Sequence, residues 1–163
     1  HYDGENLYIR LSGNEHAVKH AASVLEFDTF EQGKTLWCGI RDYKASFFND
    51  DTPLWRISVP TTVDLPLQDM QYCIDWAPPL PIEGQWLIDW GGAQYWIKTD
   101  RPADDIFTMA NAAGGSAFLF RGKTKGQDCF QPLSAELLAL HKSLKQAFDP
   151  QHILNPGKMY AEI

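Results

Sequence analysis

The sequence has few of the features that assign a chain to a class at once. Its three cysteines, Cys38, Cys73 and Cys129, cannot all pair with one another and form no Cys-x-x-Cys element, so reduced structural thiols are expected. No apolar run approaches the roughly 20 residues that cross a bilayer. No basic stretch followed by an apolar one indicates a signal peptide. Together these absences predict a cytoplasmic protein without a membrane-spanning segment.

Positive charge is also scarce. Against 21 acidic residues the chain has 14 Lys and Arg, which gives a formal net charge of −7. A nucleic acid needs a basic face for its phosphates, so this class of partner is excluded. The 163 residues suffice for one domain with a proper core, and six Trp, six Tyr and nine Phe predict that the core or a site is rich in rings.

An initiator methionine is missing as well, and a strand-like run follows His1 within a few residues. We therefore expect the C-terminal part of a longer polypeptide, with a tag remnant ahead of the domain as the alternative.

Periodicity predicts alternating strands and helices. Strands are expected at 7–11, 54–59, 86–90, 93–99 and 116–121, with a weaker candidate at 72–76 inside a proline-rich stretch, 60–83. Helices are expected from a Ser12-x-x-Glu15 capping box to about residue 26, at about 35–43 and 102–112, and from an N-cap at Ser134 to 148. Gly91-Gly92 indicates a two-residue hairpin turn, and Gly114-Gly115 the end of helix 102–112.

This order predicts an α+β fold, a ferredoxin-like antiparallel sheet with helices on one face and a C-terminal helical extension. On strand 54–59, Trp55 and Ile57 face one side of the sheet and Arg56 the other.

The last residues of the chain have the sequence features of an ordered segment. Pro150 pushes Asp149 out of the helical region, so the last helix stops there, and Asn155-Pro156-Gly157 favours a tight turn. The run from Phe148 to Tyr160 resembles the closing segment of FAD-linked oxidases of the vanillyl-alcohol-oxidase type. Four further blocks, in order along the chain, resemble the C-terminal half of the FAD-binding subunit of glycolate oxidase: 10–13, 54–60, 89–94 and 113–115.

The resemblance implies one domain over residues 1–163 that caps the flavin and shapes the substrate pocket, while FAD is held mainly by an N-terminal domain outside this chain. No glycine-rich diphosphate loop is visible in the sequence, so the fragment alone is expected to be inactive. The intact enzyme would oxidise glycolate to glyoxylate. It would pass electrons through a sister flavin subunit and an iron–sulfur subunit, and it would lie in the cytoplasm or be held peripherally at the inner membrane by that complex.

Arg41 and Arg56 are the candidate substrate-binding residues, because a guanidinium holds a carboxylate bidentately. The resemblance implies that the sheet face of Arg56 points toward the flavin, and that Arg41 matches a family arginine that follows a Leu-Trp pair. For both residues a surface ion pair is the alternative. The resemblance also implies that Asn155 and Lys158 contact the flavin or its domain. The alternative is a turn that only stabilises the fold.

Other candidates are weaker. His16 and His20 have the i, i+4 spacing of zinc ligands but lack a third ligand, so no metal is expected. The chain also departs from the family, with Tyr95 where an arginine is usual and Ser116 where a histidine is common. The alternative function is therefore a non-catalytic domain that docks the sister subunit through its Trp-rich surface and stretch 60–83. A free-standing small-molecule-binding domain is a third possibility.

Overall fold

The computed structural model describes residues 1–3, 5–62, 84–123 and 129–163. It forms two compact units, His1–Asp51 and Thr52–Ile163, and each is described by itself. The candidate strand at 72–76, Cys73 and most of the proline-rich stretch lie outside the described residues.

The second unit contains an antiparallel sheet of four strands, β1 (Leu54–Ser58), β2 (Gln85–Asp89), β3 (Gln94–Lys98) and β4 (Ser116–Arg121). The strand order β2-β3-β1-β4 places β1 between β3 and β4. In this register Arg56 lies opposite Trp96 on one neighbour and Phe118 on the other. The sheet confirms the predicted α+β fold, and its order is that of a ferredoxin-like sheet.

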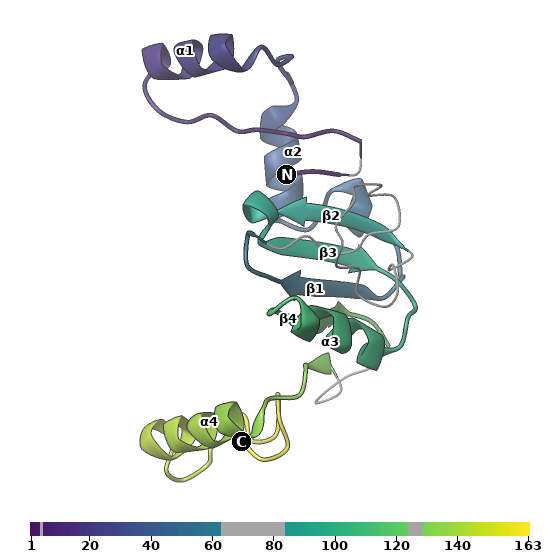
Figure 1. The fold of residues 1–163 in the computed structure, drawn as a ribbon, viewed down its shortest axis with the longest axis vertical. Coiled ribbons are helices and arrows are strands. Elements are labelled where there is room, and N and C mark those ends of the chain that lie inside the picture. The colour runs from purple at the N-terminus through teal and green to yellow at the C-terminus, as the bar shows by residue number, and fades with distance from the viewer. Residues whose placement is uncertain (4, 63–83, 124–128) are drawn as a thin grey trace. The chain divides into compact units, whose positions relative to one another are not determined.

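Helix α3 (Ala103–Ala112) connects β3 to β4 and packs on one face of the sheet (Figure 1). The rings of Trp55 and Phe107 meet edge to face at 5.6 Å between centroids, while Ile57 and Ile106 are fully buried. Trp55 and Ile57 thus face α3, and Arg56 occupies the opposite face as predicted.

A Schellman motif closes α3, as the glycine pair predicted. Gly114 has φ +66°, its N–H donates to the Asn111 carbonyl, and Gly115 N–H donates to the Ala110 carbonyl. A Cβ on Gly115 would lie 2.2 Å from the Ser58 carbonyl oxygen, so this position also sets the close approach of the chain to β1.

The hairpin of β2 and β3 is confirmed, but the two-residue turn is wrong. Asp89 pairs with Gln94, so residues 90–93 form the connection, which contains a 3₁₀ turn, η2 (Trp90–Gly92). The Asp89 side chain accepts a hydrogen bond from Trp90 N–H, and the Ala93 carbonyl accepts one from Val59 N–H. These contacts stabilise the longer turn, which the glycine pair alone does not reveal.

Helix α4 (Ala135–Phe148) begins and ends as predicted. The Ser134 hydroxyl accepts a hydrogen bond from Leu137 N–H, and Asp149 leaves the helical region with φ −138° and ψ 66° just before Pro150.

The first unit contains α1 (Glu15–Leu25), α2 (Gly33–Arg41) and a short 3₁₀ helix, η1 (Ser46–Phe48). Both α-helices were predicted, but the N-cap of α1 is Asn14 and not Ser12, because Asn14 Oδ1 accepts the Ala17 N–H. The predicted strand at 7–11 is wrong. Leu7 forms one bridge with Tyr2, and no ladder follows within the described residues.

None of the helices in the described part of the chain combines the length and the apolar composition needed to cross a membrane.

Candidate functional site

A cage of aromatic rings surrounds the guanidinium of Arg56. Its central carbon lies 5.8 Å from the ring centroids of Trp90, Trp96 and Phe118, within cation–π range of all three. The rings come from the β2–β3 turn, β3 and β4, and antiparallel register brings them around β1.

Gln94 fixes the orientation of this guanidinium. Arg56 Nε–H donates to Gln94 Oε1 at 2.8 Å, and Gln94 is almost fully buried. Among the described residues Gln94 takes the Nε side, so the terminal Nη1/Nη2 edge is left to bind a carboxylate end-on.

No carboxylate faces Arg56 among the residues that the structure describes. A half-buried cation between apolar rings is only partly hydrated, so its attraction for an anion is stronger than at an open surface. The cage therefore has the chemistry of an anion site.

Arg41 has different surroundings. It ends α2 with its side chain 72% exposed, and it forms a two-point ion pair with the adjacent Asp42, at 2.7 Å and 3.0 Å. The hydrogen bond to Asp42 raises the pKa of Arg41, and the same bond lowers the pKa of Asp42. This is the surface arrangement that the sequence left open as the alternative. Arg41 belongs to the first unit and Arg56 to the second, so substrate binding by Arg41 stays a prediction.

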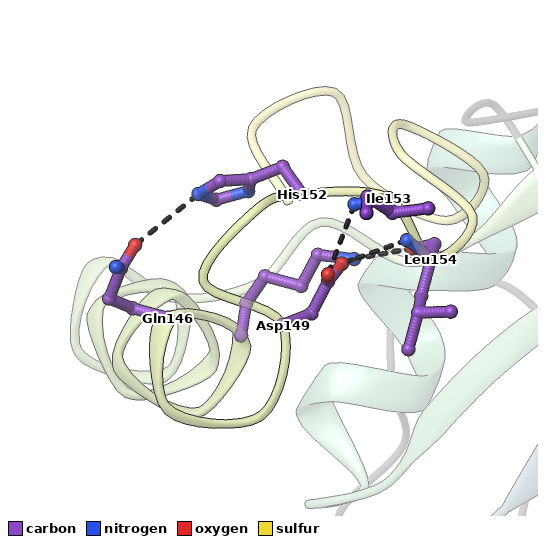
Figure 2. Close-up of polar contacts among 6 residues, drawn as sticks. Gln146, Asp149, His152, Ile153 and Leu154 are labelled. Atoms are coloured by element: carbon purple, nitrogen blue, oxygen red, sulfur yellow. Dashed lines mark hydrogen bonds and ion pairs between the residues drawn. The ribbon is translucent and has the colours of Figure 1, made fainter.

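A second polar cluster, missed by sequence reasoning, centres on Asp149 (Figure 2). Asp149 accepts hydrogen bonds from the N–H groups of Ile153 at 3.0 Å and Leu154 at 2.8 Å, and it pairs with Lys145 at 2.9 Å. Lys145 also donates to the Leu154 carbonyl. Lys145 and the two amides hold the pKa of Asp149 at about 2, well below its ordinary value. A carboxylate directly after a helix and before Pro was the available signal for this cluster.

The Asp149 cluster orders the turn that follows. Lys158 N–H donates to the Asn155 carbonyl at 3.3 Å across Pro156 and Gly157, and Gly157 has φ +65°. The sequence predicted a tight turn here, and proline second with a positive-φ glycine third are the features of a type II turn. The side chains of Asn155 and Lys158 are exposed on it. Their proposed contact with flavin stays a prediction.

Comparison with known proteins shows what this chain is similar to. Residues 121–159, which carry β4's last residue, α4, the Asp149 cluster and the turn, match the family described as FAD linked oxidases, C-terminal domain. Glycolate oxidase subunit GlcE of Escherichia coli (strain K12) is 38% identical over 162 residues, 99% of this chain and 41% of that protein. The C-terminal part of this chain is therefore similar to FAD-linked oxidases. The chain spans about two fifths of that relative, and no solved structure matches it.

FAD is the cofactor of this family. The two glycine pairs of the described residues do not form a diphosphate cradle, because both have structural tasks. Gly91 and Gly92, with φ +62° and +92°, shape the β2–β3 turn, whereas Gly114 and Gly115 close α3.

One departure from the family pattern has a packing explanation. Tyr95 is 1% exposed and lies opposite Ile57 and Ile88 in the sheet. Its side chain is therefore on the sheet face that forms the core beneath α3. An arginine here would have to be buried in that core, whereas Tyr95 fills it. Ser116, at the start of β4, is exposed.

Among the described residues, no group of three or more His, Cys, Asp or Glu side chains is arranged to hold a metal ion. His16 and His20 lie on α1 at the predicted helical spacing.

Proposed function

We propose that this chain is the substrate-side cap of a FAD-dependent oxidase that converts glycolate, or a similar small 2-hydroxy acid, to its 2-oxo acid. The observation that carries the proposal is Arg56, a caged and oriented cation with no carboxylate partner in the described part of the chain. GlcE, by its name, is a subunit of glycolate oxidase, which supports the choice of substrate.

In this proposal the Nη1/Nη2 edge of Arg56 holds the substrate carboxylate while the surrounding rings limit water. Arg41 is a second carboxylate ligand if its pair with Asp42 opens. FAD, held mainly by an N-terminal domain outside this chain, would accept the hydride from the substrate. Asn155 and Lys158, on the exposed turn, would contact the flavin or its domain.

The chain would work within a cytoplasmic complex that includes a sister flavin subunit and an iron–sulfur subunit, with peripheral attachment to the inner membrane through them.

An exposed apolar stripe on α4 favours the docking role as a second candidate. Leu137, Leu140 and Leu144 share one side of the helix at i, i+3 and i+7 and are 49%, 54% and 48% exposed. A domain that only docks would use this stripe for subunit association and would not need Arg56.

The experiment is to introduce Arg56→Met into the complete oxidase and to measure KM for glycolate, kcat and subunit co-purification. Hydrogen bonds to a charged group contribute about 1.5–3 kcal/mol, so KM should rise about 10- to 100-fold while the complex remains assembled. Arg101→Met, which removes a cation paired with Asp105, is the matched control and should leave KM unchanged. Unchanged KM in an intact Arg56→Met complex would refute the substrate role and favour docking. Arg41→Met in the same assay tests whether Arg41 also binds the substrate carboxylate.

A further inference from the structure

The segment Leu7–Leu11 has the composition of a strand without its ladder. Leu7, Ile9 and Leu11 alternate with Tyr8 and Arg10. Tyr8 N–H donates to the His1 carbonyl at 2.8 Å, and Leu7 bridges Tyr2. In the described part of the chain, the peptide groups of residues 9–11 have no hydrogen-bond partner. An extended segment with unsatisfied peptide groups can accept a neighbouring strand.

The same segment borders an apolar cavity of about 660 Å³ within the first unit. Its walls include Val18 and Leu25 of α1, Leu36 and Trp37 of α2, and all of residues 7–11. Several of its apolar lining residues are open to solvent, with Leu7 62%, Phe27 60% and Ile9 46% exposed. Within the described part of this unit, Ile40 and Phe48 are the buried apolar residues, so the unit lacks a closed core of its own.

We propose that Leu7–Leu11 is the docking edge for a β-strand from the preceding part of the longer oxidase polypeptide, which closes this cavity. This inference rests on the proposed function in taking the chain to be the C-terminal part of such a polypeptide. The match covers 41% of GlcE, so more than half of that relative lies outside it. The family matched by residues 121–159 is described as a C-terminal domain, which supports a preceding domain in the longer polypeptide.

The edge also indicates the chemistry of the incoming strand. Strands pair about 4.8 Å apart, so alternate apolar side chains on the partner would cover the cavity beside Ile9 and Leu11. Arg10 stacks on Trp37 at 5.6 Å and has no carboxylate partner among the described residues. An Asp or Glu opposite Arg10 on the partner strand would form a cross-strand ion pair.

Hydrogen exchange with mass spectrometry tests this directly, comparing the 163-residue chain with the complete oxidase polypeptide. In the chain alone the amides of residues 9–11 should exchange at the rate of open backbone. In the complete polypeptide their exchange should slow by about 100-fold or more, as in a paired strand. Equally fast exchange in the two proteins would overturn the proposal. The proposal would also be overturned if the amides of residues 9–11 were protected in the chain alone, with protection that increases with protein concentration, and if the chain had the mass of a dimer. The occupant would then be a second copy.

A variant pair separates the edge from general destabilisation. Ile9→Lys in the complete polypeptide should restore fast exchange at 10–11, whereas Val24→Lys, a 67% exposed position on α1 outside the cavity wall, should not. Slow exchange of the α2 amides in both variants verifies that the unit is still folded. The readout does not depend on turnover, so a normal KM in the Arg56→Met enzyme would refute the substrate role and leave this result standing.

Discussion

At the scale of single residues, the two candidate arginines differ in their countercharge. Arg41 uses the Nε and Nη2 edge of its guanidinium to bind Asp42 at the surface, whereas Arg56 is oriented by a neutral amide between three rings. An exposed ion pair contributes little and competes with any substrate, so Arg56 is the stronger candidate for carboxylate binding. The neutrality of Gln94 is the feature that keeps the cation available.

A carboxylate at position 94 should therefore compete with the substrate. Gln94→Glu would place a negative charge at hydrogen-bond distance from Arg56 Nε, and we expect KM for glycolate in the complete oxidase to rise about tenfold, equivalent to about 1.4 kcal/mol. Gln94→Leu removes the acceptor without adding charge and should raise KM less. Equal effects of the two substitutions would show that orientation, not charge, is what Gln94 provides.

Asp149 should make stability depend on pH in the acid range. Its folded-state pKa of about 2 lies below the ordinary unfolded value of about 3.9, so its ionised form stabilises the folded state above about pH 4. That contribution is lost as pH falls from about 4 toward 2. Urea midpoints followed by circular dichroism should be lower for Asp149→Asn than for the parent at pH 6, with a difference that shrinks between pH 4 and pH 2.5. Asp100→Asn, at an exposed position, should show no such convergence. A constant difference for Asp149→Asn across this range would contradict the assignment.

At the scale of elements, the sequence predicts well where the signal is local. β1, α3 and α4 follow from alternation, acidic first-turn residues and the Ser134 cap, all of which act within a few residues. The strand at 7–11 fails because pairing requires a partner that local alternation cannot supply. The cap at Asn14 and the four-residue hairpin connection were missed because neighbouring residues offered an equally good local signal.

The contact between Gly115 and β1 should be intolerant of any side chain. Gly115→Ala would press a Cβ against the Ser58 carbonyl, and such overpacking destabilises by about 1–3 kcal/mol. Gly33→Ala, where nothing lies within 4 Å at the start of α2, should be neutral or stabilising by up to about 1 kcal/mol. Urea unfolding of the two variants measures both effects, and a Gly115→Ala protein as stable as the parent would refute the close approach.

At the scale of the whole molecule, the two units differ in how they are held together. The buried apolar side chains of the described residues are concentrated in the sheet and α3 of the second unit, and the first contributes Ile40 and Phe48. A small unit that buries little apolar surface is marginally stable by itself.

Limited trypsin digestion of the chain should reflect this difference. The first cuts should follow Arg10 and Lys19, both exposed in the first unit, while the bonds after Arg56 in β1 and Lys98 in β3 survive. Mass spectrometry of the early fragments checks the order. Initial cleavage after Arg56 or Lys98 would contradict it.

The candidate site shows the same division between local and non-local information. Sequence alternation identifies Arg56 and its face, but Trp90, Trp96 and Phe118 meet it through the register of three different segments. Gln94 and Trp90 belong to a block already notable for its family resemblance, so their presence near a site was visible and their contact with Arg56 was not. Pairing across strands depends on the whole sheet, which no short window specifies.

The exposed wall of the cage has an optical consequence. Trp90 is 68% exposed, whereas Trp55, Trp86 and Trp96 are 3%, 9% and 1% exposed. Among the described indoles, Trp90 should dominate the long-wavelength fluorescence and be the one most accessible to a collisional quencher. Since it stacks on the guanidinium of Arg56, its emission would change when that cation takes up an anion. The chain thus has a built-in fluorophore that reports on the occupancy of Arg56 without any label.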